Sequence, residues 1–74
     1  YNIDLSQLAR NDIEAIISMM PNRRYQKLIK LKYLDEMEPE EVADELSVSI
    51  DNYYNMHLRA RKQFLAYYKL EGKR

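Results

Sequence analysis

Residues 38–64 have the sequence EPEEVADELSVSIDNYYNMHLRARKQF, which predicts two helices joined by a short turn at 47–49. Pro39 fits the first position of the first helix, because its missing N–H loses no hydrogen bond there. The acidic residues Glu40 and Glu41 suit the positive end of that helix dipole. Ser49 is a residue type that caps the start of a helix. We therefore expect a helix-turn-helix, with its second helix over 50–69.

This second helix has two distinct faces. At about 100° per residue, one mostly apolar stripe that should face a core comprises Tyr53, His57, Ala60, Phe64 and Tyr67. The opposite side carries amide, phenol and basic groups. A helix that contacts DNA bases near its start and phosphates further along needs this division. An ordinary amphipathic helix with a solvated polar face has the same periodicity, so this pattern alone leaves both interpretations open.

The run 41–64 resembles the helix-turn-helix of region 4 in bacterial RNA polymerase sigma factors, most closely that of the small ECF (extracytoplasmic function) group. The residues that carry the resemblance are Glu41, Val42, Ala43, Leu46, Ser47, Val48, Ser49 and Arg59-Ala60-Arg61. The upstream sequence also fits, with Met20-Pro21 where such domains have Leu-Pro. The resemblance covers about residues 11–69. A helix-turn-helix alone would not separate a sigma factor from the DNA-binding domain of a response regulator.

Two departures from the family pattern stand out. Ser47 occupies a turn position where the family usually has Gly, so a positive φ there would be strained. His57 stands where the family usually has Leu or Ile, and Leu58 where a polar residue is common. The apolar and polar residue types at positions 57 and 58 are therefore exchanged relative to the family pattern. This exchange affects whether Leu58 belongs to the residues that contact DNA more than it affects the fold.

The resemblance implies recognition of the −35 promoter element within RNA polymerase holoenzyme, with helix 50–69 in the major groove. The residues that we expect at the DNA are Asp51, Asn52, Tyr54, Asn55, Leu58, Arg59, Arg61 and Lys62. Asn55 is expected to bind an adenine edge and Leu58 to pack on a thymine methyl. Arg61 and Lys62 are assigned to phosphates. The implied partners are promoter DNA and the flap region of core RNA polymerase, which the segment 23–34 helps to bind in this family, with an anti-sigma factor as a further candidate.

Two other functions are compatible with the sequence. One is the DNA-binding domain of a response-regulator activator, which usually acts as a dimer. The other is a protein-interaction module, such as a sigma-like domain that has lost promoter binding. Size in solution and selection of a DNA sequence would separate them.

Composition predicts one small all-α domain. The chain has 74 residues, one Gly and no Cys. We expect four helices without a winged-helix extension, divided into a linker or frayed helix at 1–10, the helix-turn-helix domain at 11–70 and a tail at 71–74. Leu5 and Leu8 are candidates for a short helical turn. Because the chain begins at Tyr1 rather than Met, we expect it to be excised from a longer protein.

The first half of the chain predicts two further helices. Asn11 is a candidate N-cap, with Glu14 three residues later completing a capping box. Pro21 and Asn22 should end that helix. A second helix is expected over 23–34.

Charge is balanced overall but segregated along the chain. The formal net charge is zero; residues 35–51 hold eight acidic and no basic residues, and residues 23–32 hold five basic and no acidic ones. Such a domain should bind DNA weakly alone and need tethering to an anchored partner. The basic block 23–32 is equally compatible with a solvated helix surface.

Nothing in the sequence predicts catalysis, a metal or a cofactor. There is no cysteine, phosphate loop or nucleophile with a base partner. His57 is the only histidine, so it lacks companion ligands. We expect it half-buried and hydrogen-bonded to backbone or to a tyrosine, and expect His57→Leu to stabilise the domain by removing a polar group from an apolar stripe. The absence of cysteine and of a membrane span fits a cytoplasmic protein.

Overall fold

The computed structural model describes residues 4–72, and the regular structure in this range is entirely helical. Its elements in chain order are η1 (Leu5–Gln7), α1 (Arg10–Met19), α2 (Arg23–Ile29), η2 (Lys30–Leu34), α3 (Pro39–Leu46) and α4 (Ile50–Gly72). Between residues 4 and 72 there is no strand, so the prediction of an all-α, four-helix domain without a wing is confirmed. None of these helices combines the length and apolar character that a membrane span requires.

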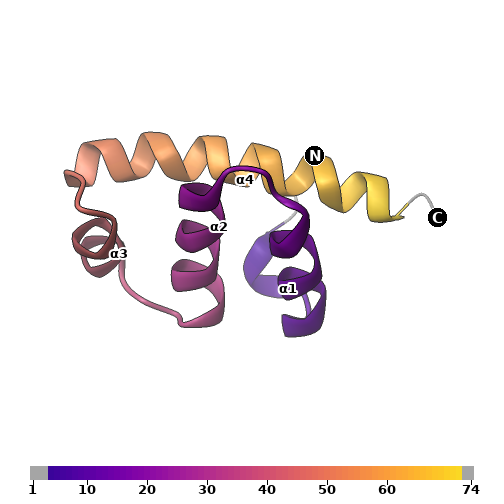
Figure 1. Ribbon diagram of the computed structural model, residues 1–74. Coiled ribbons are helices and arrows are strands. Elements are labelled where there is room, and N and C mark those ends of the chain that lie inside the picture. Colours follow the sequence, from indigo (N-terminus) through magenta and orange to yellow (C-terminus); the bar gives the residue numbers. More distant parts are fainter. Residues whose placement is uncertain (1–3, 73–74) are drawn as a thin grey trace.

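Helix α4 lies across α1, α2 and α3, which are arranged side by side beneath it (Figure 1). The core is formed where they meet, and its most deeply buried α4 residues are Tyr53, Ala60 and Phe64, each at most 1% exposed. These three belong to the predicted apolar stripe, while His57 and Tyr67 are half-buried at its edges. The predicted orientation of α4 is therefore confirmed.

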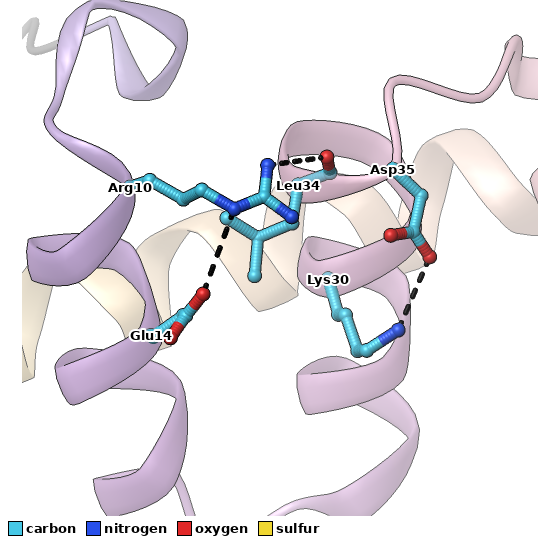
Figure 2. A network of polar contacts seen from close by, with 5 residues as sticks. All are labelled: Arg10, Glu14, Lys30, Leu34 and Asp35. Carbon is cyan, nitrogen blue, oxygen red and sulfur yellow. Dashed lines mark hydrogen bonds and ion pairs between the residues drawn. The ribbon is translucent and has the colours of Figure 1, made fainter.

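The start of α1 differs from the prediction. The helix begins at Arg10, its N-cap is Ala9 with no side-chain cap, and Asn11 lies inside the first turn. Arg10 explains the earlier start, because its guanidinium donates to the Leu34 carbonyl (3.0 Å) and pairs with Glu14 (Nε to Oε1, 3.6 Å; Figure 2). Contacts with a distant segment thus replace the predicted capping box.

A short helical turn precedes α1, as expected from Leu5 and Leu8. The Asp4 side chain caps η1 by accepting from the Ser6 N–H at 3.0 Å. Leu5 is 1% exposed and belongs to the core, against which Leu8 also packs. Residues 1–3 of the expected linker and 73–74 of the expected tail lie outside the described residues.

The segment predicted as one helix over 23–34 is continuous, but it changes from an α-helix to a π-helix after Ile29. Asn22 caps α2 by accepting from the N–H groups of Arg24 and Tyr25. From Lys30 the chain forms a π-helix, in which the Asp35 N–H donates to the carbonyl five residues back (3.0 Å). Because Leu34 ends this segment, its carbonyl has no helical partner and accepts from Arg10. Lys30 also pairs with Asp35 (Nζ to Oδ2, 3.1 Å), with α4 passing behind this network (Figure 2).

Candidate nucleic-acid interface

Helix α3 begins as its sequence predicts. Pro39 is at its first position, and Glu40 and Glu41 lie in its first turn. Glu38 and Glu41 form a capping box, in which the Glu38 N–H donates to Glu41 Oε1 at 3.0 Å. Because the first turn is stabilised by local bonds, the helix has a defined start after an irregular loop.

The turn between α3 and α4 is built on Ser47. This residue adopts the left-handed conformation (φ 58°, ψ 44°) that the family's usual Gly would favour. The Ser47 N–H donates to Asp44 O (3.1 Å) and the Val48 N–H to Ala43 O (3.0 Å). This is a Schellman arrangement, which ends α3 abruptly and lets α4 begin three residues later. The predicted helix-turn-helix is therefore present, and Ser47 has a positive φ, the conformation that the sequence indicated would be strained there.

Basic residues of α2 hold the far end of α3. The Arg24 guanidinium donates to Leu46 O (3.0 Å), and Lys27 Nζ lies 3.4 Å from Glu45 O. Cations at a helix C-terminus also interact favourably with its dipole. Part of the basic block at 23–32 is thus engaged in orienting α3, which the sequence analysis did not anticipate.

Helix α4 begins at Ile50 with Ser49 as its cap. The Asn52 N–H donates to Ser49 Oγ at 3.2 Å, as predicted. Tyr53 is 1% exposed and anchors the first turn in the core, and the ring of Tyr54 packs edge-on against it (centroids 5.3 Å apart). Burial raises the pKa of Tyr53 to about 12, so its hydroxyl is protonated at neutral pH.

One side of α4 faces away from α1, α2 and α3 (Figure 1), and we call it the open side. Most of the predicted DNA contacts are exposed residues of α4. The exposed members of the predicted set are Asp51, Asn52, Tyr54, Asn55, Leu58, Arg59 and Lys62. Amides and a phenol precede the cations along the helix. A duplex can therefore approach all seven without any change in the core.

Arg61 is placed differently from the other seven. It is half-buried at the edge of the open side. Its charge contributes to lowering the pKa of Asp4, after the two hydrogen bonds from Ser6, and it opposes the rise in the pKa of Tyr33 that burial causes. Arg61 thus lies toward η1 and η2.

His57 has the environment that we predicted. Its Nε2 lies 2.8 Å from the Tyr33 hydroxyl, and its ring stacks on Tyr53 (centroids 5.7 Å apart, planes 9° apart). Burial lowers the pKa of His57, and the nearby charges of Lys32 and Arg61 lower it further. The histidine therefore stays neutral at pH 7 and joins α4 to η2.

The sequence analysis missed a second positioning residue, Gln26. Its Nε2 donates to Ile17 O (2.8 Å) and to Met20 O (2.7 Å), two carbonyls at the end of α1. No local sequence signal identifies such a bond, because its partners belong to another helix. The capping box at Glu38 and Glu41 did have a signal, which is the spacing of three between cap and acidic residue. Within 4–72, no group of three or more His, Cys, Asp or Glu side chains is arranged to hold a metal ion.

A capped support helix, a tight left-handed turn and a longer helix with an open polar side together define a helix-turn-helix domain. Residues 10–64 match the family model described as Sigma-70, region 4. The chain therefore belongs to the sigma-70 region 4 family, whose members are DNA-binding domains of transcription initiation. Comparison with curated proteins and with solved structures gives no significant match.

Proposed function

We propose that this domain recognises the −35 promoter element as part of RNA polymerase holoenzyme, in a sigma factor of the ECF group. Helix α4 enters the major groove. Asn55 binds an adenine edge through its amide, and Arg59 and Lys62 contact phosphates on the flanking backbone. The domain itself performs no chemistry, and its place of action is the cytoplasm, where the polymerase works.

One observation carries the proposal: seven of the eight predicted contacts are exposed on the side of α4 that no other helix covers. The order of chemistry along that side supports major-groove binding. Asn52, Tyr54 and Asn55 precede the first cation, Arg59, so groups that suit base edges come before groups that suit phosphates.

The polymerase supplies the affinity that the domain lacks. The net charge is zero, and Arg24, Lys27 and Lys30 bind carbonyls or a carboxylate within the domain. Because twelve basic residues are balanced by twelve acidic ones, the sequence-independent attraction to phosphates is small. Binding to the flap region through α2 raises the local concentration of the domain at the promoter. An anti-sigma factor is a further candidate partner.

In vitro selection with holoenzyme tests the proposal. A random −35 region is selected with wild-type holoenzyme, with Asn55→Ala and with Asn11→Ala, which changes an exposed asparagine of α1. We expect a defined −35 sequence for the wild type and for Asn11→Ala. For Asn55→Ala we expect relaxed selection at one base pair and a loss of roughly 1–3 kcal/mol on the best site.

An unchanged profile for Asn55→Ala would remove that residue from the base contacts. Absence of any selected −35 sequence, while the chain still binds polymerase, would favour a sigma-like protein-interaction module. The match to Sigma-70, region 4 favours the sigma interpretation over that of a response regulator.

A further inference from the structure

Helix α4 exposes large apolar side chains although the domain is small. Within the described residues, the exposed large hydrophobics are Ile50 (37%), Tyr54 (50%), Leu58 (59%) and Leu70 (62%). The first three are spaced four residues apart. They therefore lie on neighbouring turns of one side of the helix, and we refer to them as the 50–58 stripe.

The 50–58 stripe occupies the first turns of α4, the part of a recognition helix that contacts base edges in helix-turn-helix proteins. Eight residues at about 1.5 Å per residue give it a length of about 12 Å. At about 3.4 Å per base pair, this matches three to four base pairs. Asn55 is three residues before Leu58, so the amide proposed to bind adenine lies next to that end of the stripe on the helix surface.

The same part of α4 lacks the usual guanine contacts. From Ile50 to Leu58 there is no Arg or Lys, and the first cation is Arg59. The polar groups that share the open side are the amides of Asn52 and Asn55 and the carboxylate of Asp51. Asn suits adenine, whereas Asp accepts a hydrogen bond from cytosine. Guanine is bound mainly through Arg or Lys. We therefore expect the first two turns of α4 to prefer bases other than guanine on the strand that they contact.

From these observations, and resting on the function proposed above, we propose that the 50–58 stripe packs on the C5 methyl groups of thymines in the −35 element. The thymine methyl is the one apolar group that the unmodified base pairs present in the major groove. Tyr54 and Leu58 supply the exposed surface that is complementary to it, and Ile50, which is 37% exposed, flanks them on the side nearer the core.

The geometry of Tyr54 favours such packing. Its ring lies edge-on against the buried ring of Tyr53, 5.3 Å between centroids. The Tyr54 ring is therefore packed against the core through Tyr53, and in the stripe it lies between Ile50 and Leu58. A side chain that is already held in place loses less conformational entropy when it contacts a base. Leu58 has the highest exposed fraction of the three, and its side chain is wholly aliphatic.

Replacement of thymine by uracil tests the proposal, because uracil lacks only the C5 methyl. Holoenzyme carrying the full chain is first used to select its preferred −35 sequence. Each thymine of that sequence is then replaced singly by deoxyuridine, and the affinity of the holoenzyme is measured. We expect at least one replacement to weaken wild-type binding about fourfold, as loss of one buried methyl implies.

Two variants assign the effect to the stripe. In Leu58→Ala, we expect the same uracil replacement to change affinity less than twofold, because the partner of the methyl has been removed. Leu70→Ala is the matched control: it changes an equally exposed leucine of the same helix, three turns further on. We expect it to keep the full fourfold discrimination.

Three results would overturn the proposal. The first is a selected element in which no uracil replacement weakens wild-type binding. The second is a uracil effect of equal size in wild type and Leu58→Ala. Either leaves promoter recognition by α4 standing. The third, failure of the holoenzyme to select any −35 sequence, contradicts the proposed function itself, so the two failures are distinguishable.

Discussion

At the scale of single residues, His57 contacts two aromatic side chains at the edge of the core, Tyr33 and Tyr53. From the sequence we expected His57→Leu to stabilise the domain by removing a polar group from an apolar stripe. The structure changes this expectation, because Nε2 has a partner in the Tyr33 hydroxyl at 2.8 Å. Leucine would leave that half-buried hydroxyl without a hydrogen bond. The free-energy cost of an unpaired polar group commonly exceeds the stabilisation gained from the new apolar contacts.

We therefore expect His57→Leu to lower the free energy of unfolding by about 1 kcal/mol. Adding Tyr33→Phe should recover part of this loss, because both partners are then apolar. Denaturant unfolding of the two single variants and the double variant gives the coupling between them. Strictly additive losses would show that the hydrogen bond contributes nothing.

His57 also predicts how stability depends on pH. Its pKa in the folded state lies below its ordinary value of about 6.5, first because of burial. The unfolded chain therefore binds the proton more readily than the folded domain does. The contribution of neutral His57 to folding stability is complete above about pH 6.5, and it is lost as pH falls through the folded-state pKa. We expect the melting temperature to fall between about pH 7.5 and about pH 5.5. In His57→Leu the fall over that range should be smaller; equal slopes would exclude His57 as the cause.

At the scale of elements, the turn between α3 and α4 stores strain at Ser47. A non-glycine residue in the left-handed conformation costs about 1–2 kcal/mol, whereas glycine costs some chain entropy instead. We expect Ser47→Gly to raise the free energy of unfolding by about 1 kcal/mol. Ser47→Ala keeps a Cβ and should bring no such gain. Thermal melts of both variants check this, and equal stabilisation by the two would refute the strain argument.

The junction of α2 and α3 gives a second prediction at this scale. Arg24 donates to Leu46 O at 3.0 Å, whereas Arg23, its exposed neighbour, makes no comparable bond within the described residues. Arg24→Ala should lower the free energy of unfolding by about 1 kcal/mol, since a carbonyl of α3 loses its charged donor. Arg23→Ala serves as the control and should be near neutral. Equal losses of stability in Arg24→Ala and Arg23→Ala would mean that the positive charge, rather than the hydrogen bond to Leu46 O, stabilises the domain.

Helices with local signals could be predicted from sequence, and features that depend on distant partners could not. Pro39, Ser47 and Ser49 mark the bounds of α3 and the start of α4, and the structure confirms each of them. The start of α1 was missed because Arg10 is held by a carbonyl 24 residues away. The π-helical turn after Ile29 carries no sequence signature that separates it from an α-helix.

The same distinction applies to the candidate interface. Periodicity alone placed Asn55 and Lys62 on the open side of α4, because burial of Tyr53, Ala60 and Phe64 fixes the rotation of the helix. Arg61 is half-buried at the edge of the open side, and its charge acts on Asp4, the cap of η1. Its surroundings depend on where residues 4–8 pack, which no pattern in the sequence shows. The assignment of Arg61 to a phosphate remains a prediction.

At the scale of the whole molecule, α4 has two roles on opposite sides. One side closes the core formed by α1, α2 and α3, and the other carries the proposed contacts with promoter DNA (Figure 1). The open side can therefore be altered without loss of the fold. Because the charge of the domain is balanced, we expect the proposed promoter binding to require attachment to the polymerase.

Site-directed DNA cleavage tests the placement of α4 most directly. The chain contains no cysteine, so a single one can carry an iron chelate that cleaves nearby DNA. Ala66→Cys places the chelate on the open side of α4, one turn beyond Lys62, and Ala15→Cys places it on the exposed surface of α1. In promoter-bound holoenzyme, we predict cleavage around the −35 element from position 66 and none there from position 15. Promoter-bound holoenzyme that is cleaved at −35 only from position 15, or from neither position, would contradict the account.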